Sequence, residues 1–293
     1  MEHKLKVLFI NPKSSNIDAL PIPPLGILYL ASYLRSKGYN DIKVIDNNKE
    51  DKPVQSLKEE IKRYDIIALT GTTSQFKQTK QLSKISKELN KTVIFGGPHA
   101  TPLADDILDK SSIDIVVIGE GEITFYDLIK AIEDNKDINK VKGIVYKKER
   151  DIIKTKEREF IKNLDDLPFP DRGLVPIKDY PMRELKRFSG PYTHMMAGRG
   201  CPGKCIFCSS PLMWKYARLR SAENVFDEMK EIYDKYNIKN IHFQDDTFTL
   251  SKKRVDRLCD LIIDSKIGFR WSCQARPDNV DFNILKKMKK AGC

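Results

Sequence analysis

Three cysteines lie close together in the sequence GRGCPGKCIFC, residues 198–208. They are Cys201, Cys205 and Cys208, and no cysteine precedes them in the chain. Three thiolates on one short loop suit a [4Fe–4S] cluster in which one iron has no protein ligand and stays open to an external one. The CxxxCxxC spacing therefore predicts redox chemistry at an open iron–sulfur cluster. Phe207, directly before the third cysteine, is an aromatic side chain that can shield such a cluster.

A structural zinc site is the alternative for this loop. Such a site needs four closed ligands, usually arranged as two pairs. The candidates for a fourth ligand, His194, Cys259 and Cys273, belong to other predicted elements. Cys259 lies on an apolar helical face, as is typical of a core thiol. The spacing favours the cluster over zinc.

The elements ahead of this loop follow a regular α/β pattern. Short apolar runs alternate with amphipathic stretches such as LGILYLASYLRSKG, which predicts strands and helices in turn. Continuous apolar strands indicate a parallel sheet with helices on both faces, so we predict a doubly wound, Rossmann-like or flavodoxin-like domain over residues 1–138. The predicted strands are residues 6–10, 42–46, 65–71, 92–97 and 114–121.

Ligands of a doubly wound sheet bind beyond the carboxyl ends of its strands. The residues there have small, hydroxyl or polar side chains that can approach and bind a bulky ligand. None of the loops at these strand ends contains a GxGxxG or GxxxxGK[ST] motif, which argues against nucleotide triphosphates, flavin and nicotinamide as ligands of this domain. His99 alone is more often structural than a metal ligand, and Glu120 and Glu122 can be helix N-terminal carboxylates. The candidate ligand-binding residues are Thr72, Thr73, Gly96, Gly97, His99, Glu120 and Gly121.

The second half begins with a predicted linker. Residues 139–190 contain a hairpin-like alternation and then a proline-rich stretch without helical periodicity. Three strand–helix pairs follow over residues 191–293, as in a (β/α) barrel, whose chemistry collects at the carboxyl ends of its strands. Cys201, Asp245, Asp246 and Arg276 all fall at such ends.

At these residues the sequence resembles the radical S-adenosylmethionine enzymes, through Cys201-x-x-x-Cys205-x-Phe207-Cys208 at the end of a first barrel strand. The resemblance implies that residues 191–293 form the first half of a (β/α)6 partial barrel. It implies that S-adenosylmethionine binds the open iron through its amino and carboxylate groups. A small electron donor such as flavodoxin or ferredoxin would reduce the cluster, whose electron cleaves S-adenosylmethionine to a 5′-deoxyadenosyl radical.

The same resemblance extends to two further segments. FQDDTFT makes Asp245 and Asp246 candidates for contact with the methionine amino group, and WSCQARPD makes Arg276 a candidate for its carboxylate or for substrate. A carboxylate pair beside a strand end can also be a simple helix cap. No residue is assigned a catalytic role beyond these contacts.

Residues 1–138 are similar to the cobalamin-binding domain that precedes the barrel in one group of these enzymes, through GTTSQ, GGPHAT and GEGEIT. No D-x-H-x-x-G motif occurs, so the resemblance implies cobalamin bound without a protein histidine below the cobalt. The seven loop residues named above would then line its pocket. A degenerate domain without cofactor is the alternative. Methylthiotransferases carry a second cluster on cysteines of their N-terminal domain, and residues 1–200 contain none.

The composition of the chain limits its expected binding partners and its expected cellular location. The net charge is +11, but the lysines are spread along the chain, so nucleic acid is not the expected partner. No stretch reaches the length of a membrane span, and the first residues lack the apolar core of a secretory signal. Reduced thiols fit the cytoplasm.

The expected function is methylation of an unactivated carbon of a small-molecule or lipid substrate, with S-adenosylmethionine and cobalamin. Oxidative cyclisation or rearrangement in the same family is one alternative, and a non-catalytic zinc or iron–sulfur module is another. Only three strand–helix units follow the linker, whereas barrels of the family usually have six. We therefore expect a truncated barrel with uncovered apolar surface near Phe269, and a chain that is part of a longer protein.

Overall fold

A computed structural model describes residues 4–16, 20–149, 151–181 and 190–293. The chain divides into two compact units. Unit 1 comprises Met1–Ile161 and Pro168–Val175, and unit 2 comprises Lys162–Leu167 and Pro176–Cys293.

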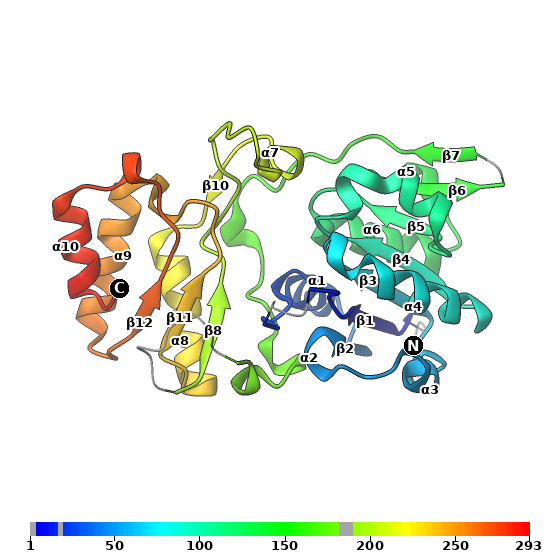
Figure 1. The fold of residues 1–293 in the computed structure, drawn as a ribbon, viewed down its shortest axis with the longest axis horizontal. Coiled ribbons are helices and arrows are strands. Elements are labelled where there is room, and N and C mark those ends of the chain that lie inside the picture. The colour runs from blue at the N-terminus through cyan, green and yellow to red at the C-terminus, as the bar shows by residue number, and fades with distance from the viewer. Residues whose placement is uncertain (1–3, 17–19, 150, 182–189) are drawn as a thin grey trace. The chain divides into compact units, whose positions relative to one another are not determined.

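Unit 1 is built on a seven-stranded sheet with the order β2-β1-β3-β4-β5-β6-β7 (Figure 1). Its first five strands are parallel, as predicted, and have the 2-1-3-4-5 order of flavodoxin-like folds. The strands are β1 Val7–Asn11, β2 Ile42–Asp46, β3 Ile66–Thr70, β4 Thr92–Gly96, β5 Ile115–Val117, β6 Ile144–Lys148 and β7 Asp151–Lys154.

The hairpin that we predicted as part of the linker belongs to this sheet. β6 pairs antiparallel with β5, and β7 pairs antiparallel with β6. Val145 is fully buried and packs in the same core as the parallel strands, which explains why the hairpin stays on the sheet. Only the proline-rich part of the predicted linker connects the sheet of unit 1 to that of unit 2 along the chain. Residues 182–189 of this part lie outside the described residues.

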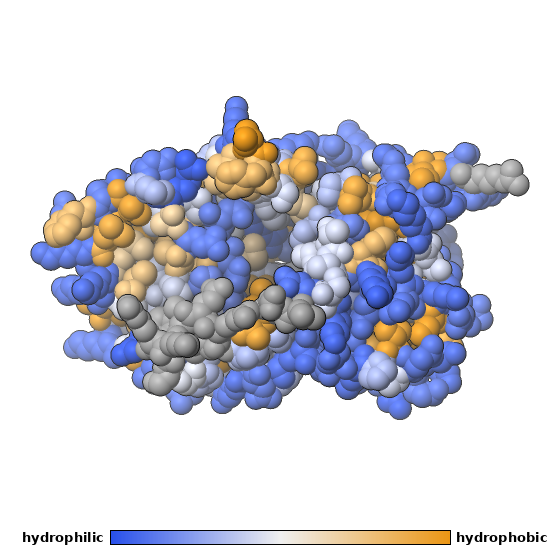
Figure 2. Space-filling view, viewed as in Figure 1, coloured by the Kyte–Doolittle hydropathy of each residue, from blue (hydrophilic) through white to orange (hydrophobic). Residues whose placement is uncertain are grey.

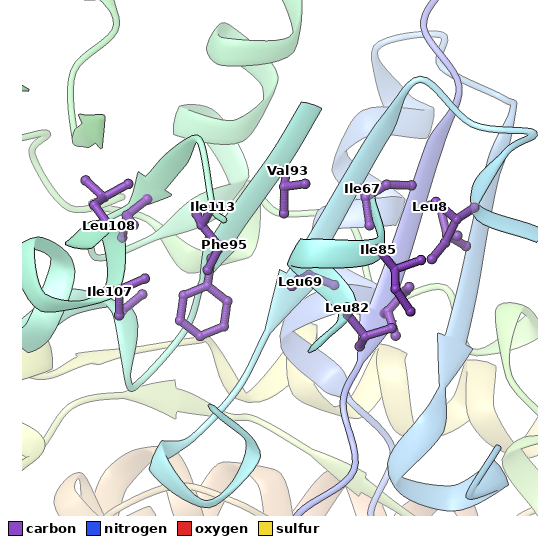
Figure 3. Close-up of a cluster of buried hydrophobic side chains, with 14 of the residues drawn as sticks. Leu8, Ile67, Leu69, Leu82, Ile85, Val93, Phe95, Ile107, Leu108 and Ile113 are labelled. Atoms are coloured by element: carbon purple, nitrogen blue, oxygen red, sulfur yellow. The ribbon is translucent and has the colours of Figure 1, made fainter. Parts of the chain in front are cut away.

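Helices cover both faces of this sheet. On one face, α4 and α5 place Leu82, Ile85 and Ile107 against the strand residues shown in Figure 3. On the other face, Phe9 of β1 meets Phe125 of α6 with ring centroids 5.3 Å apart. The two-sided burial explains the continuous apolar strands of the sequence. The helices are α1 Leu25–Ser36, α2 Asn47–Glu50, α3 Lys58–Ile61, α4 Phe76–Glu88, α5 Ala100–Lys110 and α6 Gly121–Glu133.

Unit 2 contains the three predicted strand–helix pairs. Its strands β8, β11 and β12 form a parallel sheet in the order β12-β11-β8, with α8, α9 and α10 packed on one face (Figure 1). Phe243, Phe248 and Trp271 make its aromatic core. The elements are β8 Tyr192–Met195, α8 Ala222–Tyr236, β11 Asn240–Phe243, α9 Lys252–Ser265, β12 Arg270–Ser272 and α10 Phe282–Lys290.

Side-chain caps define where these three helices begin. Ser221, Ser251 and Asp281 each accept a hydrogen bond from a backbone amide in the first turn of α8, α9 and α10. A cap of this kind satisfies one of the unpaired amides at a helix start. Each helix therefore begins at a fixed residue a short distance after a strand end.

The first strand of unit 2 is short, and a separate strand follows it directly. β8 ends at Met195, and Gly198–Arg199 form a separate short strand, β9, which pairs antiparallel with β10, Arg218–Leu219. The cysteine loop thus leaves β9 and not the main sheet. It runs into α7, Ser210–Met213.

Hydrophilic residues cover much of the face in Figure 2, with hydrophobic residues scattered among them. Phe282 and Leu285 of α10 are exposed, in line with the expected uncovered surface, but Phe269 is buried against Tyr233. Across the described residues, none of the helices has the length and apolar character needed to span a membrane.

Candidate functional site

The cysteine loop begins at a glycine that no other residue can replace without strain. Gly200 has a φ of +87°, and an added Cβ would lie 2.8 Å from the Tyr216 carbonyl oxygen and 2.9 Å from the Trp214 Cβ. Both close atoms belong to the segment that returns from α7 to β10. The tight turn at Gly200 therefore brings Cys201 directly to the end of β9.

The three thiols share one compact loop. The amides of Gly203 and Ser210 point at the Sγ atoms of Cys201 and Cys208, at 3.3 Å and 3.4 Å, and the Cys208 amide donates to the Cys205 carbonyl at 3.0 Å. Backbone N–H groups directed at sulfur are a usual environment of cluster cysteines.

Gly203 lies between two of the sulfurs. A Cβ on Gly203 would be 3.0 Å from the Arg276 Nη1 atom, 3.3 Å from the Cys201 sulfur and 3.8 Å from that of Cys205. The absent side chain therefore leaves room for the Arg276 guanidinium next to these sulfurs. The loop offers a donor set of thiols alone, which fits an iron–sulfur cluster.

Residues from the other two strand ends reach this loop. The Thr247 hydroxyl, after β11, lies 3.4 Å from the Cys201 sulfur. Arg276, after β12, has its Nη1 atom 3.8 Å from the Cys205 sulfur. Asp246 accepts a hydrogen bond from the Ser210 hydroxyl in α7. The structure thus brings the three cysteines, Asp246 and Arg276 to one edge of the unit 2 sheet.

Arg276 has a second partner in Asp278, 3.0 Å away. The Asp278 carboxylate raises the pKa of Arg276, and Arg276 lowers the pKa of Asp278. Arg276 therefore remains a cation at any physiological pH. It places positive charge next to a thiol sulfur at the mouth of the loop.

Asp245 is placed differently from Asp246. Its side chain is only 3% exposed, and its Oδ2 atom accepts a hydrogen bond from the Ala197 amide at 2.9 Å. Burial raises the pKa of Asp245 to about 6, although the Ala197 amide, Arg254 and Arg220 act in the opposite direction. In this structure its carboxylate contacts the backbone behind the loop and does not reach the thiols.

No single-ion site is preformed in the part of the chain that the structure describes. There, no three His, Cys, Asp or Glu side chains converge closely enough to hold one metal ion. His194 faces His242, with ring centroids 5.4 Å apart. Cys259 is fully buried, and burial raises its pKa to about 12, as expected of a core thiol. Because each thiolate of a cluster binds a different iron, a cluster needs no such convergence on one point.

Ile206 and Phe207, within the loop, are almost fully exposed. Hydrophobic residues stand out in Figure 2 at the place that α7 occupies in Figure 1. In this structure Phe207 faces solvent and does not cover the sulfurs.

In unit 1, the predicted loops after β3 and β4 meet. The Thr73 hydroxyl lies 3.0 Å from the His99 Nδ1 atom, and the His99 amide donates to the Gly71 carbonyl at 3.1 Å. The imidazole packs on Phe76 with ring centroids 4.6 Å apart. Burial lowers the pKa of His99, and its Nε2 atom is buried without a hydrogen-bond partner.

The neighbouring residues give this edge a polar surface with little bulk. Thr72 and Thr73 are exposed, and Thr72 forms a capping box with Gln75. Gly97 has a φ of +100°, and its Cβ would lie 2.7 Å from the Thr70 hydroxyl, so only glycine fits. Gly96 has ordinary van der Waals space beside it. Exposed hydroxyls, small residues and an orphan imidazole nitrogen fit the rim of a large polar ligand such as cobalamin.

Glu120 and Gly121 have structural surroundings. The Glu120 Oε2 atom accepts a hydrogen bond from the Ile161 amide at 2.8 Å, and Glu120 precedes the first residue of α6. A Cβ on Gly121 would lie 2.9 Å from the Leu30 side chain of α1. These contacts explain both residues through packing within unit 1.

Sequence reasoning missed three residues of the unit 2 site: Gly203, Ser210 and Thr247. Thr247 directly follows the two aspartates, so its position after a strand end was a usable signal. Gly203 and Ser210 contact sulfur through backbone amides, which leave no trace in residue type.

Comparison with known proteins finds two matching domains in this chain. Residues 19–129 match the B12 binding domain, and residues 195–293 match the Radical SAM superfamily. An uncharacterised methyltransferase of Pyrococcus horikoshii is 34% identical over 99% of this chain and 64% of its own length. The anaerobic magnesium-protoporphyrin IX monomethyl ester cyclase of Rubrivivax gelatinosus is 29% identical over 98% of this chain and 54% of its own length. This chain thus spans between half and two thirds of these relatives.

A solved structure shares the fold of both units. The radical S-adenosylmethionine methyltransferase TsrM of Kitasatospora setae, with cobalamin and a [4Fe–4S] cluster bound, has a TM-score of 0.79 at 18% identity, over 99% of this chain and 58% of that one. At this identity the likeness concerns the fold alone. The two matched domains, B12 binding over residues 19–129 and Radical SAM over residues 195–293, place this chain among the radical S-adenosylmethionine proteins that carry a B12-binding domain.

Proposed function

We propose that this chain binds a [4Fe–4S] cluster through Cys201, Cys205 and Cys208 and binds cobalamin at the carboxyl edge of the unit 1 sheet. The whole protein would be an enzyme that methylates an unactivated carbon of a small-molecule or lipid substrate. The observation that carries the proposal is the loop itself, on which three thiols lie with no competing ligand type and with amides directed at two sulfurs.

When bound, the cluster would supply one-electron cleavage of S-adenosylmethionine, and cobalamin would supply methyl transfer. The residues of the chain would position these groups. The three thiolates would hold three irons and leave the fourth open. Gly203, which has no side chain, leaves room for the Arg276 guanidinium next to two sulfurs, and Thr247 lies beside the Cys201 sulfur.

Two opposite charges flank the loop and match the ends of an amino acid. Arg276 is a permanent cation beside Cys205, and Asp246 is an exposed carboxylate beside α7. We infer that Arg276 binds the carboxylate of the methionine moiety and that Asp246 accepts its amino group. Such charge-assisted hydrogen bonds orient a ligand as well as bind it.

At the carboxyl edge of unit 1, Thr72, Thr73, Gly96, Gly97 and His99 would line the cobalamin pocket. His99 is held by Thr73 and by two aromatic rings, and burial favours its neutral form. No D-x-H-x-x-G motif surrounds His99, so we assign it a lining role and not that of a ligand below the cobalt. Glu120 and Gly121 would support the pocket through the start of α6.

Oxidative cyclisation is the second candidate, because the Rubrivivax gelatinosus relative is a cyclase by name and covers 98% of this chain. We further propose a cytoplasmic location, since Cys205 and Cys208 are exposed thiols that need a reducing compartment. A small one-electron donor such as flavodoxin or ferredoxin is the expected partner. The net charge of +11 would favour an acidic one.

The test is electron paramagnetic resonance of the anaerobically reconstituted, reduced chain with and without S-adenosylmethionine. We expect a cluster signal that changes on addition of S-adenosylmethionine in the wild type and is absent after substitution of the three loop cysteines by alanine. Cys293→Ser, which removes an exposed cysteine outside the loop, is the matched control and should keep the signal. Bound zinc without iron would instead identify a structural module and refute the proposal.

A further inference from the structure

We propose that Asp245 and Arg254 are positioning residues that clamp the peptide groups of Ala197 and so fix where the cysteine loop leaves the sheet. This inference rests on the proposed function in so far as the loop holds a cluster. It gives Asp245 a role different from contact with S-adenosylmethionine.

The clamp engages both backbone groups of one residue. The Ala197 amide donates to the Asp245 carboxylate at 2.9 Å, and the Ala197 carbonyl accepts from the Arg254 guanidinium at 2.7 Å. The same carbonyl also accepts from the Arg220 amide at 3.0 Å. In a continuous strand these groups would pair with a neighbouring strand, so the side chains replace the sheet at this point.

Ala197 lies at the break between β8 and β9. β8 ends two residues before it, and β9 begins directly after it. The neighbouring Met196 carbonyl accepts from the Arg220 guanidinium at 2.7 Å. Side chains from three elements therefore fix the direction of the chain between β8 and β9.

The clamp is charged and buried, which makes it rigid. Asp245 is 3% exposed, Arg220 is 5% exposed, and Glu228 of α8 forms an ion pair with Arg220. With Arg254, the group contains two anions and two cations. Buried charges persist only when they are paired and hydrogen-bonded, so movement of any member carries a large cost.

The clamp lies only four residues before Cys201, and the residues between leave little freedom. A Cβ on Gly198 would lie 2.7 Å from the Leu219 side chain and 3.2 Å from the Asp245 Oδ1 atom. Gly200 is equally confined. A displacement at Ala197 would therefore pass directly to the first cysteine.

Arg254 also connects the clamp to the next strand end. Its second nitrogen donates to the Phe248 carbonyl at 2.7 Å, in the turn that follows Asp246 and Thr247. The same guanidinium thus holds the entry to the cysteine loop and the segment whose Thr247 hydroxyl lies beside Cys201. Loss of Arg254 would loosen both.

The test measures hydrogen–deuterium exchange of residues 196–201 in the metal-free chain. Asp245→Ala removes the acceptor of the Ala197 amide, and we expect exchange of that amide at least about tenfold faster, as for loss of a buried hydrogen bond. Asp245→Asn keeps an acceptor oxygen and should stay near the wild type. Arg254→Lys keeps the charge but loses the fixed fork whose two nitrogens reach the two carbonyls, and it should be intermediate.

The matched control is Asp281→Ala, which removes another carboxylate that accepts a backbone amide in unit 2, at the start of α10. It should speed exchange in α10 and leave residues 196–201 unchanged. Fluorescence of the buried Trp271 verifies that each variant is folded. If Asp245→Ala does not fold, the exchange rates of Arg254→Lys and Asp245→Asn are compared instead, and the clamp predicts faster exchange of residues 196–201 in Arg254→Lys.

The second measurement is the rate at which a chelator removes iron from the reconstituted variants. We expect faster loss from Asp245→Ala than from Asp281→Ala, and an unchanged response of the Asp245→Asn cluster signal to S-adenosylmethionine. Unchanged exchange in Asp245→Ala would overturn the clamp. Loss of that response in Asp245→Asn, with normal exchange, would make Asp245 a ligand contact instead. A wild-type chain that takes up no iron would refute the proposed function. The hydrogen–deuterium exchange of the metal-free chain would still test whether Asp245 and Arg254 fix Ala197.

Discussion

The buried ion pair between Arg220 and Glu228 gives a sharp prediction about the stability of unit 2. Glu228 is fully buried in α8, and Arg220 is 5% exposed. The Arg220 guanidinium also donates to the Met196 carbonyl at 2.7 Å and to the Asn224 side chain at 2.6 Å. In Glu228→Ala it would stay buried at those acceptors without its counter-charge.

Removal of one partner of a buried pair costs about 3–5 kcal/mol. Since the free energy of unfolding of a domain is about 5–15 kcal/mol, this loss would take a large part of the stability of unit 2. With a urea dependence of about 2 kcal/mol per molar, the unfolding midpoint should fall by roughly 1.5–2.5 M. Replacement of both partners by apolar residues of similar size should recover most of it.

The assay is a urea titration followed by tryptophan fluorescence. The two tryptophans of the chain, Trp214 and Trp271, both lie in unit 2, so the signal reports that unit alone. Glu223→Ala is the matched control, because Glu223 lies on the exposed side of the same helix and pairs there with Arg257 of α9. Equal midpoints for the two variants would refute the reasoning that burial gives the Arg220–Glu228 pair its importance.

Three further predictions concern the loops of both units. Gly97→Ala should destabilise unit 1 by about 1–3 kcal/mol, because Gly97 has a positive φ and the Thr70 hydroxyl is close to it. Gly26→Ala is the control and should not destabilise the unit, since the space around Gly26 is open. Thermal unfolding, monitored by circular dichroism, compares the two variants. Burial lowers the pKa of His99, so the folded unit favours the neutral imidazole. The free energy of unfolding of unit 1 should therefore be highest above the unfolded-state pKa of about 6.5 and should decrease as the pH falls through the lower folded-state pKa. His99→Gln should flatten this decrease, and an unchanged pH profile in urea titrations would contradict it. Arg276→Ala should weaken binding of S-adenosylmethionine roughly tenfold in equilibrium dialysis, with Arg276→Lys intermediate, and equal affinity would argue against a contact.

The sequence predicted the fold and the site correctly where a pattern of residue types is compatible with few structures. Five apolar runs predicted five parallel strands because strands that are buried on both faces need continuous apolar residues. The CxxxCxxC spacing predicted the loop because few arrangements need three thiols so close together. Cys259 was correctly predicted as a core thiol from its apolar helical face.

Other features depend on contacts between distant segments, which local patterns do not contain. The hairpin β6–β7 alternates like any exposed hairpin, and its place on the sheet depends on Val145 and Ile152, which pack in the common core. Asp245 and Asp246 are neighbours of one residue type, yet one is buried against Ala197 and the other is exposed beside Ser210. At the break between β8 and β9, the Ala197 carbonyl likewise accepts a hydrogen bond from Arg254, 57 residues away.

The central claim is tested most directly by the iron and sulfide content of the chain after anaerobic reconstitution. We predict about four irons and four sulfides per wild-type chain and none above background when Cys201, Cys205 and Cys208 are all alanine. The Cys293→Ser control should match the wild type. Equal iron in the wild type and the triple variant, or zinc in place of iron, would contradict the assignment of this loop to a cluster.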